Sequence, residues 1–220
     1  MEELNRIRRA SLWIFIIPVV AIHSCLFISV NYHLFENTIF IVDQIGRSGF
    51  TIPYIDGSLS IIRAARTYPS YLLFKPGMII TAIILIHYWI SNNNLFKKID
   101  DFSKKNKYFL FFGVGSALFL IAHSIFLGIN FETDLYKLLR RFVLLGFIIF
   151  EIIAQALLVI TLYKIKDKIT DICNKKILFA KIVLVSILSI VALPACNTSS
   201  LPVFLYMSFA DAKIPATSFF

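Results

Sequence analysis

The sequence predicts an all-α fold, a polytopic bundle of transmembrane helices, and two observations support this prediction. Of the 220 residues, 58% are hydrophobic and only 16% are charged, and the mean hydropathy is +0.79. Soluble domains are usually about 45–50% apolar and about 25% charged. The apolar residues are also gathered into long uncharged runs, and about 20 apolar residues in a helix cross a hydrocarbon core of about 30 Å. We therefore predict a multi-pass integral membrane protein.

Five runs are long enough to be predicted as spans: residues 10–31, 72–91, 108–130, 142–164 and 178–193. The first run follows several arginines, as the core of a signal peptide would. Its apolar part is longer than a signal core, however, and no small-x-small cleavage pattern closes it. We interpret it as a retained span. The fifth run is the shortest and stops at Pro194.

Residues 1–193 are predicted to form a single transmembrane helical domain, because no linker or internal repeat divides them. The longest connection within this domain is the loop 32–71. The tail, residues 194–220, is interrupted by three prolines and by the charged residues Asp211 and Lys213. A regular span does not tolerate such a pattern, so the tail is predicted not to cross the membrane.

The basic residues are unevenly distributed between the two sides of the predicted bundle. Thirteen lie in the N-terminal segment and in the loops at 97–107 and 164–176, whereas seven lie on the opposite side. The positive-inside rule then places the N-terminus in the cytoplasm and the loop 32–71 outside. The predicted membrane is the bacterial inner membrane, or that of the Golgi, ER or lysosome in a eukaryote. Membrane lipids are the expected partners, and the net charge of +9 does not require nucleic acid.

The loop 32–71 carries a predicted site for a lipid head group. Its stretch SLSIIRAARTY is compatible with a short helix, on which Arg63 and Arg66 would share one face. Lys75 follows within the first turn of the second span. Together the three cations are predicted to hold a lipid phosphate. The alternative is that they are ordinary interfacial anchors beside the tyrosines of the same segment.

Three ionisable residues lie within the predicted spans, where such residues are costly and are functional candidates by default. His23, His123 and Glu151 are 7 to 9 residues from the outer ends of their spans, or roughly 10–14 Å at the helical rise. Gln155 follows Glu151 by one turn. We predict that the three form one polar cluster in the outer half of the bundle. It would serve as a general base or proton relay, as a head-group site, or only as hydrogen-bonded packing.

A metal site is disfavoured by the same residues, because the three side chains would come from three separate helices without a metal-binding spacing. No metal and no cofactor are predicted. Whether the protein is an enzyme stays open, because Ser24, Ser116 and Ser124 have no triad partners nearby in sequence.

The stretch IPYIDGSLSIIRAARTYPSYLLFK, followed directly by PGMIITAIILIHYWI, resembles the Frag/DRAM/Sfk family of polytopic membrane proteins. Pro53, Tyr54, Ile55 and Asp56 stand at the position of the family's outer-loop motif, and Pro69 stands at its later proline. The resemblance adds Asp56 to the predicted head-group site. It also implies a sixth span, in whose place this chain has the tail with its prolines.

Two functions follow from the resemblance and the site together. The first is an integral membrane protein that acts on or with membrane lipids, of the GPI-anchor lipid-remodelling type. Its lipid head group would sit under Arg63, Arg66 and Lys75 and would reach His123 and Glu151. The second is a non-enzymatic scaffold or modulator of membrane trafficking or autophagy. A transporter is disfavoured, because the sequence shows no repeats.

Overall fold

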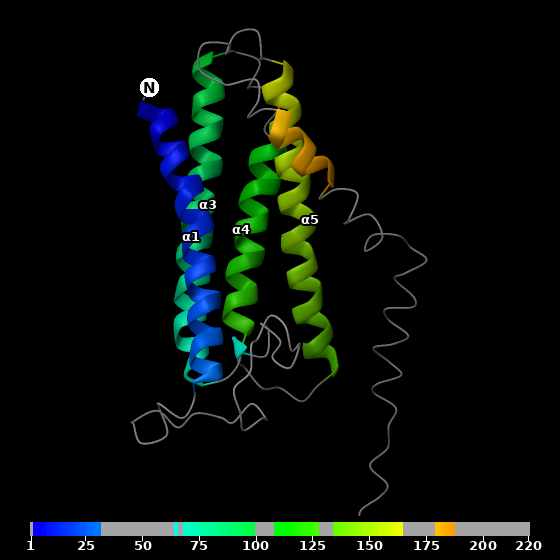
Figure 1. Ribbon diagram of the computed structural model, residues 1–220. Coiled ribbons are helices and arrows are strands. Elements are labelled where there is room, and N and C mark those ends of the chain that lie inside the picture. The colour runs from blue at the N-terminus through cyan, green and yellow to red at the C-terminus, as the bar shows by residue number, and fades with distance from the viewer. Residues whose placement is uncertain are drawn as a thin grey trace, which may run out of the picture.

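The computed structural model shows a bundle of long antiparallel helices (Figure 1). The residues that it describes are 2–31, 64–65, 68–99, 108–127, 134–164 and 179–187. The long helices are α1 (Glu2–Val30), α3 (Ser70–Ile99), α4 (Tyr108–Phe126) and α5 (Asp134–Lys164). Residues 179–187 form a shorter helix. The predicted all-α fold is confirmed for the described residues, and the four long helices are each long and apolar enough to cross a membrane.

The helices match the first four predicted spans, but their ends differ. α5 begins at Asp134, eight residues before the predicted start of its span, and α3 continues through Lys97 and Lys98. A hydropathy run marks only the apolar part of a helix, whereas residues such as Leu, Lys and Arg continue the helix beyond it. The fifth predicted span, 178–193, contains helical residues 179–187, and its remainder lies outside the described residues. That span stays a prediction.

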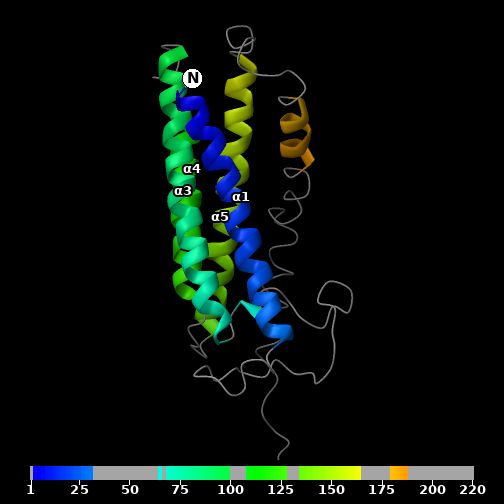
Figure 2. The same cartoon turned by 60° about the vertical axis from the view of Figure 1, so that its left-hand side comes forward.

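The four long helices pack in chain order. α1 packs against α3, α3 against α4, and α4 against α5, and these are the only extensive contacts between them. Turning the bundle by 60° shows that α1, α3, α4 and α5 lie on an arc, with helix 179–187 beyond α5 (Figure 2). The N-terminus and the last residues of α3 and α5 are at one end of the bundle, which we call the N-terminal end.

Glycines allow these helices to approach closely. A Cβ on Gly77 of α3 would lie 3.0 Å from the Cβ of Ala21 on α1, and a Cβ on Gly113 of α4 would overlap the indole of Trp89 on α3. Small residues at such positions favour packing in a bilayer, because no hydrophobic force drives helices together in lipid. Trp89 is consequently fully buried and packs against Phe109, with ring centroids 6.3 Å apart.

The surface that faces away from these contacts is strongly apolar. Large side chains such as Phe15, Phe111 and Phe142 are more than half exposed, although they are typical core residues in water-soluble proteins. Contiguous exposed apolar surface of this kind marks contact with a membrane or another protein. The apolar exterior and the lengths of the helices agree with a multi-pass membrane protein.

The orientation of the bundle in the membrane stays a prediction, which labelling can test. In a variant that lacks the three native cysteines, we expect Ser48→Cys in the loop 32–71 to react with a membrane-impermeant maleimide added outside. Ser103→Cys, in the lysine-rich loop between α3 and α4, should react only after the membrane is permeabilised. Labelling of Ser103→Cys in intact cells would contradict the predicted cytoplasmic N-terminus.

Candidate functional site

Glu151 is the acidic side chain at the centre of a polar cluster in the bundle. Its Oε2 accepts a hydrogen bond from Ser116 Oγ of α4 at 2.7 Å, and its Oε1 accepts one from Gln155 Nε2 at 2.9 Å. Gln155 is four residues further along α5, so the two side chains are neighbours on one helix face. Ser116 is one of the buried residues of α4, and its hydrogen bond to Glu151 joins α4 to α5. Both oxygens of the carboxylate are thus fixed by neutral donors.

α3 contributes two aromatic residues to the same place. The indole N–H of Trp89 lies beside the Glu151 carboxylate but does not meet the geometry of a hydrogen bond to it. Tyr88 packs edge-on against Trp89, with ring centroids 5.3 Å apart, and interacts electrostatically with Glu151. Asn92 is one turn further along and donates to the Tyr88 carbonyl oxygen at 2.8 Å.

Lys181 brings a positive charge to the cluster from helix 179–187. Its Nζ donates a long hydrogen bond to Tyr88 Oη at 3.5 Å, and it interacts electrostatically with Glu151. Since α3 and helix 179–187 are not neighbours on the arc, this contact crosses the concave side of the bundle (Figures 1 and 2). We refer to the six residues below as the Glu151 cluster: Tyr88, Trp89, Ser116, Glu151, Gln155 and Lys181.

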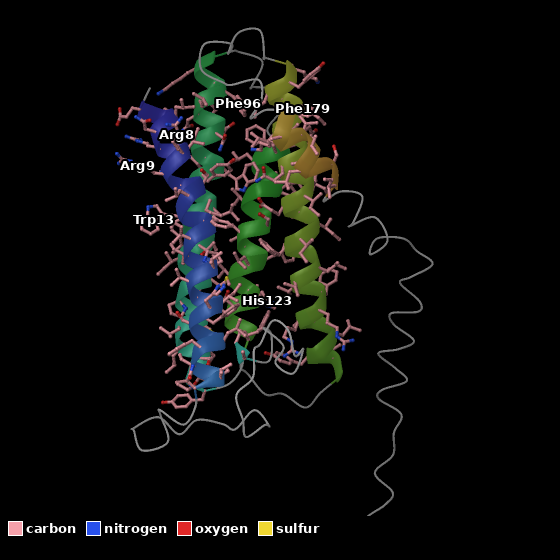
Figure 3. The ribbon with its side chains drawn as sticks, in the orientation of Figure 1. Arg8, Arg9, Trp13, Phe96, His123 and Phe179 are labelled. Carbon is pink, nitrogen blue, oxygen red and sulfur yellow. The ribbon has the colours of Figure 1, made fainter. Side chains whose placement is uncertain are left out.

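The predicted grouping of Glu151 with the two histidines is not found. His123 is seven residues beyond Ser116 on α4, so it lies roughly 10 Å from the level of Glu151. Figure 3 shows His123 in the half of the bundle away from the N-terminal end. The predicted common depth was wrong because it was counted from residue 142, whereas α5 begins at Asp134.

His23 is further still from Glu151. Its near neighbour Cys25 donates to the carbonyl oxygen of Ser70 at the first residue of α3, whereas Glu151 is level with Trp89, nineteen residues later. At the helical rise this separates His23 from Glu151 by roughly 25 Å. His23 itself is exposed, and its Nδ1 lies 2.7 Å from the Val19 carbonyl oxygen.

Of the four residues of the predicted lipid-phosphate site, only Lys75 is among the residues that the structure describes. Lys75 lies early in α3, with its Nζ 5.2 Å from the centroid of the Tyr71 ring, a cation–π contact. Asp56, Arg63 and Arg66 lie outside the described residues. Their role stays a prediction.

Ala64 and Ala65, which precede Arg66 in the same loop, are described and buried. Ala65 belongs to the same core as Cys25 and Phe74. This part of the loop therefore packs against the end of the bundle that is opposite the N-terminal end.

Sequence reasoning missed most partners of Glu151. The spacing of Ser116 from Gly113 and Leu120, three and four residues away, was the available signal, because it puts the three on one helix face. In the structure the buried residues of α4 do recur at helical spacing: Phe109, Gly113, Ser116, Ala117, Leu120 and Ser124. This pattern places Ser116 on the packed face of its helix. For Lys181, no sequence pattern links the side chain to Tyr88 or Glu151.

The chemistry open to this cluster is that of hydrogen bonding and charge. A carboxylate offers about four acceptor positions, of which Ser116 and Gln155 use two. The remaining positions accept from hydroxyl or ammonium groups, and Lys181 provides a cation for a phosphate. Among the described residues, no three His, Cys, Asp or Glu side chains come together as metal ligands do. Comparison with protein-family models, curated proteins and solved structures gives no match to this chain.

Proposed function

We propose that this membrane protein acts on or with membrane lipids, and that the Glu151 cluster binds the polar head group of a lipid. The observation that carries the proposal is a carboxylate inside a spanning helix, with both oxygens oriented and a lysine from another helix nearby. Ionisable groups at such depth are costly, so they generally mark ligand or ion sites. A lipid head group carries the hydroxyl, ammonium and phosphate groups that these side chains recognise.

The arrangement of the helices supports access from the membrane. α1 and α5 do not pack extensively against each other, so the four long helices form an open arc rather than a closed ring. The contact between Lys181 and Tyr88 lies on the concave side of this arc. A lipid whose chains remain in the bilayer can therefore present its head group to Glu151 from the side.

The resemblance to the Frag/DRAM/Sfk family makes lipid remodelling of the GPI-anchor type the specific form of this proposal. The alternative function is that of a non-enzymatic scaffold. The two differ in whether the lipid that binds is chemically changed, which lipid analysis of cells lacking the protein detects directly.

The substitution Glu151→Gln tests the head-group site. We expect it to lower the lipid retained per folded protein at least about tenfold, because a hydrogen bond to a charged group contributes about 1.5–3 kcal/mol. The measurement is native mass spectrometry of the protein released from nanodiscs made with a total lipid extract. Glu2→Gln is the matched control, since Glu2 is exposed and pairs with Arg6 at the N-terminal end.

Equal lipid retention in Glu151→Gln and in the unchanged protein would contradict the proposal. The cluster would then act only in helix packing, as intramembrane hydrogen bonds often do, and the non-enzymatic scaffold would be the better description.

A further inference from the structure

The first three turns of α1 carry several charges, and they are not equivalent. Arg6 Nη2 forms an ion pair with Glu2 Oε1 at 2.8 Å. Glu3 Oε1 pairs with Lys98 Nζ of α3 at 3.2 Å. These two pairs engage both acidic residues of α1, so no acid of this helix remains for the other two arginines.

Arg8 and Arg9 are the uncompensated cations. Both are exposed, and no described acidic residue forms an ion pair with either guanidinium. Figure 3 shows Arg9 on the outer side of α1, away from the rest of the bundle, and Arg8 directly precedes it on the helix. They are therefore available to a partner that is outside the protein.

Trp13 lies on the same face of α1, four residues after Arg9 and one turn deeper. It is 50% exposed, and the exposed side chains of the next two turns are apolar, namely Phe15, Val19 and Val20. Along α1 the exposed side chains thus change from cations to an indole and then to aliphatic and phenyl groups. A lipid leaflet changes in the same order, from phosphates to ester carbonyls to hydrocarbon. Trp and Arg are enriched at this interface for that reason.

We propose that Arg8, Arg9 and Trp13 form a binding site for an anionic phospholipid in the leaflet at the N-terminal end. The guanidinium groups would hold the phosphate by paired hydrogen bonds, which an arginine forms better than a lysine. The indole would lie against the glycerol region of the same lipid. If the predicted orientation holds, this leaflet is the cytoplasmic one, which is rich in anionic lipids. The site is separate from the Glu151 cluster and does not depend on its proposed role.

The two tryptophans of the chain allow a direct test. Trp13 is exposed, whereas Trp89 is fully buried, so a quencher carried by a lipid reports on Trp13. The protein is reconstituted in phosphatidylcholine vesicles that contain an equal fraction of either brominated phosphatidylglycerol or brominated phosphatidylcholine. We expect the anionic quencher to be at least about threefold more effective, with a preference that falls as salt rises.

The double substitution Arg8→Gln with Arg9→Gln should bring the two quenchers close to equal effect. The matched control is Arg140→Gln with Arg141→Gln, which removes the same charge from an adjacent arginine pair at the other end of the bundle. This control should keep the preference. Trp13→Phe should remove nearly all quenching by either lipid and so confirm the source of the signal.

Two results would overturn the site. One is an unchanged preference after both Arg8 and Arg9 are replaced. The other is an equal loss of preference in the Arg140 and Arg141 control, which would show a response to net charge alone.

Discussion

Gly113→Ala is expected to disrupt the contact between α3 and α4 and to destabilise the protein more than the same change at Gly77, Gly115 or Gly146. The new Cβ would overlap the indole of Trp89, which is fully buried and held between Phe109 and Tyr88. Overpacking of this kind costs about 1–3 kcal/mol, and more where the neighbour is rigid. The measurement is the midpoint of thermal unfolding in detergent, followed by the far-UV circular dichroism of the helices, a signal that does not depend on Trp89.

A second substitution shows whether the clash is the cause. Trp89→Leu alone should be destabilising, since loss of a buried aromatic side chain typically costs about 3–5 kcal/mol when it is truncated to Ala. In the Gly113→Ala background the same change should cost much less, because the smaller side chain makes room for the methyl group. Gly146→Ala is the milder control, since its Cβ would lie 3.0 Å from the edge of the Phe119 ring. Additive effects at positions 113 and 89 would contradict this account.

Lys181→Met is expected to destabilise the protein substantially while Glu151 is present. It would remove the positive charge that interacts electrostatically with the Glu151 carboxylate, and coupled neighbours of this kind contribute about 0.5–3 kcal/mol. Glu151→Gln should cost less by itself, because the amide keeps a hydrogen-bond acceptor for Ser116. Thermal unfolding in nanodiscs gives each change in stability.

The double variant measures the coupling between the two charges. In the Glu151→Gln background, Lys181→Met should be nearly silent, so that the cycle gives a coupling free energy of about 0.5–3 kcal/mol. Ser116→Ala is the control for loss of a neutral donor and should not show this dependence on Lys181. If the effects at 151 and 181 simply add, Lys181 does not balance the charge of Glu151, and helix 179–187 is held by other contacts.

The order of the spanning helices followed from the sequence, because hydropathy depends on composition along the chain and not on the partners of each residue. The runs at 10–31, 72–91, 108–130 and 142–164 each correspond to a long helix. It also followed that Glu151 would have a partner inside the bundle, since an acidic residue in such a run is costly when it is unpaired. Neither inference required knowledge of which helices touch.

The identity of that partner required the tertiary structure. Depth along a helix is counted from its end, and the sequence marked the edge of the apolar run at 142 but not the helix start at Asp134. An error of eight residues is more than two turns, and it moved Glu151 from the level of His123 to that of Ser116.

The sequence by itself therefore determined that the chain folds as apolar helices with a carboxylate among them. Only the packing decided what surrounds this carboxylate. The close approach at Gly113 fixes the rotation and register of α4 against α3, because the Trp89 indole fits only where no Cβ is present. That register brings Trp89 and Ser116 to Glu151, and Lys181 reaches them from a helix that is distant in sequence. Contacts of this kind depend on the shapes of side chains on different helices, which no single run of residues encodes.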